Sequence, residues 1–322
     1  MGVPRATTDE AGRPSLAAEL RAVADRYWGR LTRPLAGPPA HPDPDLTVLL
    51  SEPFSGVDDV YDRLSATETH LRSRDDRRAV FLTVYVAMTA RVRAGIEGGE
   101  PRFEDPDWTR AYLVAFAEEY RRALVDFERG RPVPPAWRVA FGASLSDRTL
   151  VVQDALLGIN AHIVNDLAFA LDEVGIGDRD GGERARRRAD HLAINEVLAG
   201  LADVVQTTLA SMYEASGLAE IDALLGRFDE DATLFGLRAA REFAWTNAAL
   251  LADRPRLAPF VRWRVRTVAT GSAYALLSPT IDPTLRDELR ALEDGEPVLA
   301  AVSEAVHGPD EGRARRDRRR HA

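Results

Sequence analysis

Residues 155–171 read ALLGINAHIVNDLAFAL, and this stretch decides the fold class of the chain. It is apolar nearly all round a helix, except for a small polar set: Asn160, His162, Asn165 and Asp166. Such a helix belongs in the middle of an all-helical protein, where other helices cover every side of it. Because burying ionisable groups is costly unless they pair, bind a metal or react, the same stretch also indicates where a site lies.

Helical patterns continue on both sides of this stretch, which we expect to lie within one central helix over about 147–174. A Pro-rich connection, PLAGPPAHPDPD, lies between Pro34 and Pro53 and is predicted not to be helical. No stretch alternates with the two-residue period of a strand, and no fixed-period repeat is visible. The other predicted helices span about 16–31, 55–72, 75–96, 105–129, 183–216, 218–227, 230–253, 255–278 and 282–306.

The sequence therefore predicts one all-α domain over residues 15–306, with disordered ends at 1–14 and 307–322. The length of 322 residues and the hydrophobic content of 45% are sufficient for a large core. The C-terminal end carries six arginines between Arg313 and Arg320. We interpret it as a solvated basic tail rather than as an arm for nucleic acid or an anionic membrane.

The composition excludes several kinds of chemistry. The chain has no Cys and no Lys, so all 42 basic residues are Arg, and thiolate, disulfide and Schiff-base chemistry are ruled out. The net charge of −9 argues against a nucleic-acid partner. The sequence has neither an uninterrupted apolar run of about 18 residues nor the apolar core of a signal peptide. We therefore predict a soluble, cytoplasmic protein without a membrane span, and the Arg-only, Ala-rich composition is typical of a prokaryote.

His162 and Asp166 lie one helical turn apart and share a face. A neutral imidazole and a carboxylate at this spacing serve either as two ligands of a divalent metal ion or as a general base with the acid that orients it. A third interpretation turns both residues toward solvent, because aliphatic residues such as Leu156 and Leu167 lie on the opposite side.

Asp190 lies in the apolar stripe of the following helix, near its start, with His191 and Asn195 on the flank. An Asp in a first turn also has a structural role, because it interacts favourably with the helix dipole. Metal sites in helical bundles take ligands from neighbouring helices in this manner. We predict that Asp190 meets His162 and Asp166 in a shared polar cavity, where the three are the catalytic residues and the ligands of a divalent metal ion.

Further residues are predicted to bind a small-molecule substrate, namely Asn160, Asn195, Arg241, Trp245 and Tyr85. Arg241 lies near the apolar stripe of its helix, with Trp245 one turn later. A buried Arg needs an anion. We expect a carboxylate of the protein to supply it, and a bound phosphate or carboxylate is the alternative.

The order of several segments resembles a prokaryotic family of helical proteins of unknown function, over about residues 50–280. The most specific segment is GINAHIVNDLAFAL at 158–171. The others include RDDRRAVFLTVYVAMTARV at 74–92, PPAWRVAF at 134–141, DHLAIN at 190–195 and AREFAWTNAALL at 240–251. The resemblance implies the helical fold and the positions of the site, and it brings no activity with it.

A second resemblance is to the class I terpene cyclases, which are also all-helical. Asn165, Asp166 and Glu173 are similar in spacing to their magnesium-binding element N-D-x-x-S-x-x-x-E. Position 169, however, is Phe, and the acidic pair at residues 75–76 is followed by two arginines. The resemblance implies, as an alternative, a magnesium-dependent enzyme that uses Asn165 and Glu173.

These patterns support two classes of function. The first is an enzyme that acts on a small molecule, in a pocket between the 147–174 and 183–216 helices. There His162 is a ligand or the general base, and Asn160 and Asn195 donate hydrogen bonds to the substrate. The second is a binding or scaffold protein, in which the same polar residues form a structural network that joins buried helices.

Overall fold

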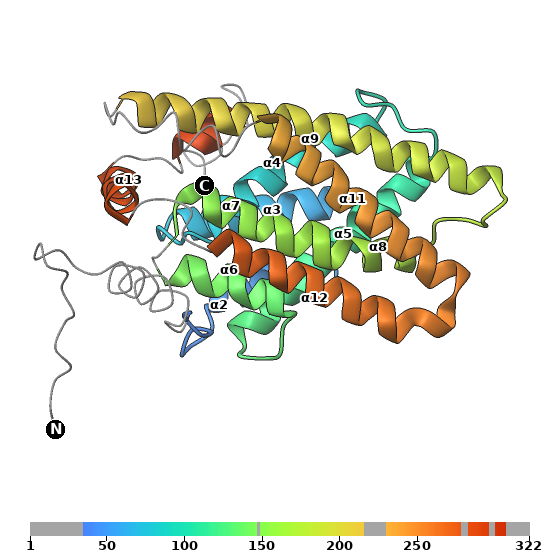
Figure 1. The fold of residues 1–322 in the computed structure, drawn as a ribbon, viewed down its shortest axis with the longest axis horizontal. Coiled ribbons are helices and arrows are strands. Elements are labelled where there is room, and N and C mark those ends of the chain that lie inside the picture. The colour runs from blue at the N-terminus through green and yellow to red at the C-terminus, as the bar shows by residue number, and fades with distance from the viewer. Residues whose placement is uncertain (1–34, 147–148, 216–229, 278–282, 296–299, 307–322) are drawn as a thin grey trace, which may run out of the picture.

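The computed structural model describes residues 35–146, 149–215, 230–277, 283–295 and 300–306. Within these ranges the chain is helical and contains no strand, which confirms the predicted all-α class. The helices pack into one domain around a common core (Figure 1). The segments 1–14, 16–31, 218–227 and 307–322, for which we predict disorder or helix, lie outside the described residues.

The helices follow one another along the chain with short connections. They are α2 (Pro44–Leu49), α3 (Val57–Arg72), α4 (Ala79–Ile96), α5 (Pro106–Glu128), α6 (Pro135–Leu145), α7 (Val151–Ile159), η1 (Asn160–Asp166), α8 (Leu167–Val174), α9 (Gly182–Ala215), α11 (Glu230–Asp253), η3 (Pro255–Leu257), α12 (Ala258–Leu277) and α13 (Pro283–Gly295). In Figure 1, α9 runs along one edge of the domain, and α11 and α12 form a hairpin beside the green rod of α7, η1 and α8.

The central stretch lies in the middle of the domain, as predicted. It is continuous helix, but its centre, Asn160–Asp166, is wound as a π-helix between α7 and α8. This segment contacts α5, α6, α11 and α12 as well as its two neighbours in sequence. π-Helical turns are rare and occur mostly at functional sites. Here the turn contains all four polar residues that interrupt the apolar pattern.

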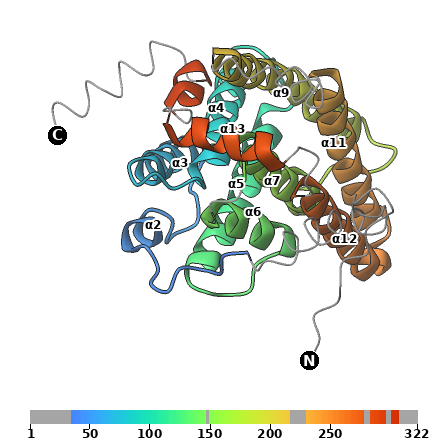
Figure 2. The same cartoon turned by 60° about the vertical axis from the view of Figure 1, so that its left-hand side comes forward.

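Helices α4 and α5 pack against the central rod and supply most of its aromatic neighbours. Gly158 allows the close approach of α4, because a Cβ at this position would lie 2.4 Å from the Phe81 ring. Within the described residues, α4 has the length and composition of a membrane span, but 67% of it is buried inside the protein. The apolar surface of α4 is thus used for packing in the core (Figure 2).

Two short helices lie where the sequence predicts none. α2 lies inside the Pro-rich connection, with Pro44 at its first position, where the missing N–H has no partner to lose. Asp43 caps this helix, since its side chain accepts a hydrogen bond from the N–H of Asp45 at 2.9 Å. α6 begins in the same way at Pro135, in a segment interpreted above as a break. In both cases proline starts a helix rather than preventing one.

Candidate functional site

His162 and Asp166 form a buried pair in η1. The Nδ1 of His162 lies 3.0 Å from the Oδ2 of Asp166, and each residue is 1% exposed. The carboxylate also accepts hydrogen bonds from the Nε1 of Trp137 at 2.8 Å and the Nδ2 of Asn165 at 2.7 Å. The predicted pairing on one face is present, and the interpretation that the two residues face solvent is wrong.

Burial controls the protonation of this pair. It lowers the pKa of His162 well below its usual range, so the imidazole is neutral. Burial also raises the pKa of Asp166 to about 7, although hydrogen bonds from Asn165 and Trp137 and the charge of Arg122 act in the opposite direction. When the Nδ1–H of His162 is donated to the carboxylate, Nε2 keeps its lone pair. An imidazole oriented in this way is suited to act as a general base.

Aromatic rings enclose the imidazole of His162. Phe116 stacks on it, with 3.5 Å between ring centroids and 7° between planes, and Tyr85 meets it edge-on at 4.6 Å. The aromatic cage around His162 consists of Phe81, Tyr85, Phe116, Tyr120 and Trp137. These rings come from α4, α5 and α6. Three helices distant in sequence from η1 therefore build the surroundings of the pair.

Several buried polar atoms of the pair and the cage have no hydrogen-bond partner among the described residues. They are the Nε2 of His162, the Oδ1 of Asn165 and the hydroxyls of Tyr85 and Tyr120. Leaving a buried polar group unsatisfied costs about 1–3 kcal/mol, and native proteins rarely do so. Burial raises the pKa of both tyrosines, so their hydroxyls keep the proton and can donate it to a ligand.

Asp190 does not join this pair. Its carboxylate accepts hydrogen bonds from the backbone N–H groups of Glu104 at 2.6 Å and Asp105 at 2.8 Å, at the start of α5. Within the described residues, His162, Asp166 and Asp190 do not bring their ligand atoms within 4.8 Å of one another, so their predicted convergence as a metal site is wrong. The free N–H groups at the start of a neighbouring helix attract the carboxylate. An argument from its own helix does not identify them.

Arg241 is buried, as predicted, but its partners are neutral. Its Nε donates to the Oδ1 of Asn195 at 2.7 Å, and its Nη2 donates to the backbone oxygen of His191 at 2.5 Å. No carboxylate in the described part of the chain forms an ion pair with it, so the predicted salt bridge is wrong. The side chain reaches α9 where His191 and Asn195 lie one turn apart. With Tyr112, whose hydroxyl lies 3.2 Å from the Nδ1 of His191, these residues form the Arg241 cluster.

A cavity of about 20 Å³ separates the aromatic cage from the Arg241 cluster. Tyr85 and Phe116 line it from the cage, and Tyr112 and Arg241 line it from the cluster. The remaining lining residues are Met88, Val92, Thr109, Leu113 and Ile194. The volume exceeds the roughly 10–15 Å³ that one water-sized group needs. The cavity lies among α4, α5, α9 and α11, and not between the central helix and α9 as predicted.

Two other predicted substrate residues lie apart from the cavity lining. The Nδ2 of Asn160 donates to the backbone oxygen of Ala269 at 2.8 Å and so ties η1 to α12. Trp245 packs beside His191, with 5.1 Å between ring centroids, and the guanidinium of Arg188 lies over its outer face. Their contacts support the cluster and the rod, and their predicted roles with substrate stay predictions.

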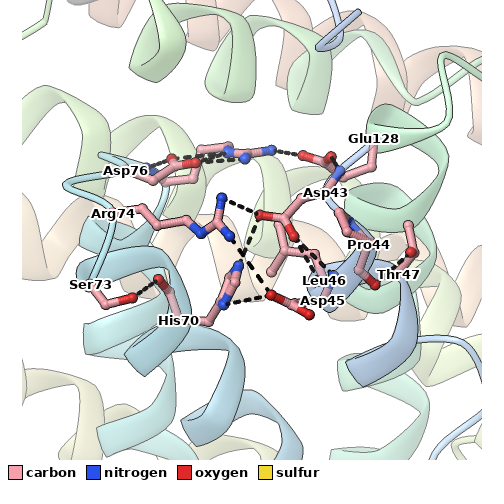
Figure 3. A network of polar contacts seen from close by, with 11 residues as sticks. Asp43, Pro44, Asp45, Leu46, Thr47, His70, Ser73, Arg74, Asp76 and Glu128 are labelled. Atoms are coloured by element: carbon pink, nitrogen blue, oxygen red, sulfur yellow. Dashed lines mark hydrogen bonds and ion pairs between the residues drawn. The ribbon is translucent and has the colours of Figure 1, made fainter. Parts of the chain in front are cut away.

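A separate polar cluster lies at the start of α2 and the end of α3 (Figure 3). Asp43, Asp45 and His70 place potential metal ligands within 4.8 Å of one another. The Oδ2 of Asp43 lies 2.8 Å from the Nε2 of His70, and Arg74 approaches Asp43 at 3.5 Å and Asp45 at 3.7 Å. Because Arg74 already neutralises both carboxylates, these contacts explain the cluster as a tie between the two helices.

The residues of the terpene-cyclase element have unlike surroundings. Asn165 is buried and donates to Asp166, whereas Glu173 is exposed and lies 3.7 Å from Arg122. Asp76, from the acidic pair, is bound by Arg78. Three ligands of one metal ion need a common opening, and these positions do not share one. The spacing therefore reflects the helical period.

Sequence reasoning missed Tyr112, Phe116 and Trp137 as parts of the site. A signal for two of them is present in α5, where Trp108, Tyr112, Phe116 and Tyr120 recur every four residues and form one aromatic face. No comparable signal marks Trp137, which belongs to a helix that the sequence does not predict.

The fold and the site define an all-helical protein with a buried His–Asp pair in a π-helix, enclosed by aromatic rings. Residues 57–279 match the model of a family of unknown function, DUF5995, and the chain belongs to this family. The match confirms the resemblance noted in the sequence, and the family brings no activity with it. No curated protein and no solved structure matches the chain.

Proposed function

We propose that this protein is an enzyme that acts on a small molecule, with His162 as general base and Asp166 as the residue that orients it. The observation that carries the proposal is the unpartnered Nε2 of a neutral, buried imidazole whose Nδ1 lies 3.0 Å from a carboxylate. A base in this arrangement removes a proton from a substrate O–H, N–H or activated C–H.

The neighbouring groups support the same role. The hydroxyls of Tyr85 and Tyr120 are buried donors without a partner, so they are available to hold a polar substrate near His162. Tyr85 and Phe116 contact the His162 ring and also line the cavity. We infer that the substrate reaches Nε2 from the cavity when these two rings turn aside.

A non-enzymatic network is the alternative, and the hydrogen bonds to Asp166 are what favour it. A purely structural network, however, normally satisfies all its buried members, since a partly satisfied one destabilises the core. The unpartnered atoms of His162, Asn165, Tyr85 and Tyr120 therefore favour a ligand-binding role. Because α4 is mostly buried, the proposal also keeps the protein soluble and cytoplasmic.

The test is a comparison of substrate consumption by wild-type and variant protein. Each purified protein is incubated with a small-molecule extract of bacterial cells, and mass spectrometry follows which compounds disappear and form. We expect His162→Gln to slow any conversion by about 10²–10⁴, the usual contribution of a general base. His70→Gln, in the cluster between α2 and α3, is the matched control and keeps the wild-type rate. A conversion that is unchanged in His162→Gln, or the absence of any conversion by the wild type, contradicts the proposal.

A further inference from the structure

The guanidinium of Arg241 is the least compensated charge in the described core. The residue is 2% exposed, and its hydrogen bonds go to an amide oxygen, a backbone oxygen and a neutral imidazole. Burial lowers the pKa of His191 well below its usual range, with the charge of Arg241 as a further cause, so this imidazole adds no second charge. A buried cation without an anion is unfavourable, because the loss of hydration is not offset.

The other buried arginines of the domain show what is missing. Arg78 is bound by Asp76 and by Glu128, and Arg77 lies 2.8 Å from Asp154. Each buried guanidinium thus has a carboxylate, whereas Arg241 has none among the described residues. An anion from outside the chain is the remaining way to neutralise it.

The cavity beside Arg241 offers such an anion a place and further contacts. Arg241, Tyr85 and Tyr112 line it together, and the Tyr85 hydroxyl is buried without a partner. A hydroxyl donor and a guanidinium on one small cavity are the groups that bind an oxyanion. The remaining walls are apolar side chains such as Met88 and Ile194, which suit the hydrocarbon part of a ligand.

We infer that the Arg241 cluster binds the carboxylate of a small organic acid, and that the substrate of the enzyme is such an acid. The second half of this inference rests on the proposed function, whereas carboxylate binding itself does not. One cation with neutral neighbours matches the single charge of a carboxylate. A phosphate carries up to two charges and more oxygens than this cavity has donors. The position of Tyr85, against both the cavity and His162, places the rest of the acid next to the general base.

The test measures binding of sodium formate and sodium acetate, with sodium chloride and inorganic phosphate as comparisons at the same ionic strength. The readouts are the thermal midpoint of unfolding and the ¹⁵Nε chemical shifts of the arginines. We expect formate and acetate to raise the midpoint of the wild type in a saturable manner, by about 2–4 °C at ten times Kd. They should also shift one buried arginine signal, while chloride and phosphate have little effect.

Three variants decide the location of the site. Arg241→Gln should lose both responses to carboxylates. Arg184→Gln, in which the arginine removed is already paired with Asp253 at 2.7 Å, is the control and should keep them. If Arg241→Gln does not fold, Tyr85→Phe keeps the ring and removes one hydroxyl, and it should weaken acetate binding about two- to tenfold. An unchanged carboxylate response in these two variants, or a stronger response to phosphate than to acetate, overturns the inference.

The two proposals fail in different ways. His162→Gln keeps the Arg241 cluster and should retain its response to acetate even though turnover is lost. Acetate binding without any His162-dependent conversion would overturn the enzyme and leave the carboxylate site. A His162-dependent conversion in a protein that does not bind acetate or formate would overturn only the carboxylate site.

Discussion

Two buried aspartates on the same helical rod, Asp154 in α7 and Asp166 in η1, differ in their surroundings. Asp154 lies 2.8 Å from the Nε of Arg77 and accepts hydrogen bonds from the hydroxyls of Ser144 at 3.0 Å and Thr149 at 2.5 Å. The carboxylate thus has a cation and two further donors. Asp166 is equally buried, but no arginine contacts it.

The difference separates a structural carboxylate from a candidate catalytic one. Burial raises the pKa of both aspartates, and only Asp154 has a directly bonded cation to oppose this rise. With neutral donors alone, Asp166 has a pKa of about 7 and exchanges its proton near neutral pH. Groups with such perturbed pKa values concentrate at functional sites. The following predictions test whether the two aspartates differ in this way.

The largest effect is expected for Asp154→Ala, which leaves the guanidinium of Arg77 partly buried without its closest carboxylate. Removing one partner of a buried ion pair costs about 3–5 kcal/mol in the free energy of unfolding. Urea unfolding measures this loss. The control is Asp107→Ala, on an exposed part of α5, which should change stability by no more than about 0.5 kcal/mol. A loss below about 1 kcal/mol for Asp154→Ala would remove the basis of the comparison.

Gly158, between the two aspartates, is the next most sensitive position. A Cβ there would lie 2.4–2.7 Å from atoms of Phe81, which belongs to the aromatic cage. Overpacking of this kind costs about 1–3 kcal/mol, so Gly158→Ala should destabilise by that amount in urea unfolding. Because Phe81→Leu makes room for the methyl group, the double variant should lose less stability than the sum of the two single variants. Additive losses would show that the contact is not the cause.

The dependence of stability on pH should reveal the protonation of Asp166. Its pKa in the folded state is raised to about 7 from an ordinary 3.8, so the folded state holds the proton more tightly than the unfolded chain. Its contribution to stability is therefore complete below pH 4 and is lost as the pH rises through 7. One group contributes a slope of at most about 1.4 kcal/mol per pH unit.

Glu119 acts in the same window and with the same sign, because burial and then the charge of Asp166 raise its pKa to about 7. Urea midpoints between pH 5 and pH 8 should therefore fall less steeply in Asp166→Asn and in Glu119→Gln than in the wild type. Identical slopes in all three proteins would show that neither carboxyl titrates in this range.

The smallest effect is expected for Asp166→Asn at pH 7, with a loss of about 1 kcal/mol or less. No cation is left unpaired, and the amide oxygen still accepts from Trp137. Rotation of the Asn165 amide turns its unpartnered Oδ1 toward the new amide N–H. Stability near that of the wild type, together with impaired turnover, would match a functional carboxylate. A loss as large as that of Asp154→Ala would make Asp166 a structural residue as well.

Much of the fold was predictable from local patterns. The helices that became α3, α4, α5, α9 and α11 follow the 3.6-residue period of apolar side chains, and Asp105-Pro106 marks the start of α5 as expected. Prolines were misjudged at Pro44 and Pro135, where they begin helices. The π-helix was not predicted, because its extra residue in the turn changes backbone hydrogen bonds without altering the apolar pattern.

The site was predictable only where its members lie on one helix. The pairing of His162 with Asp166 follows from their spacing. The partners of Asp190 and Arg241 did not follow, since backbone N–H groups of α5 and neutral acceptors on α9 satisfy them instead of the expected groups.

The sequence by itself determined that the chain is all-helical, that residues 155–171 lie at its centre, and that His162 and Asp166 meet. These properties depend on periodicity and on spacing within one helix, which are local. The tertiary structure decided which charges are paired. Asp154 has an arginine, Asp166 has Trp137, and Arg241 has no carboxylate in the described chain, because each of these contacts depends on how separate helices pack. The electrostatics of the candidate site therefore follow from the packing of its helices.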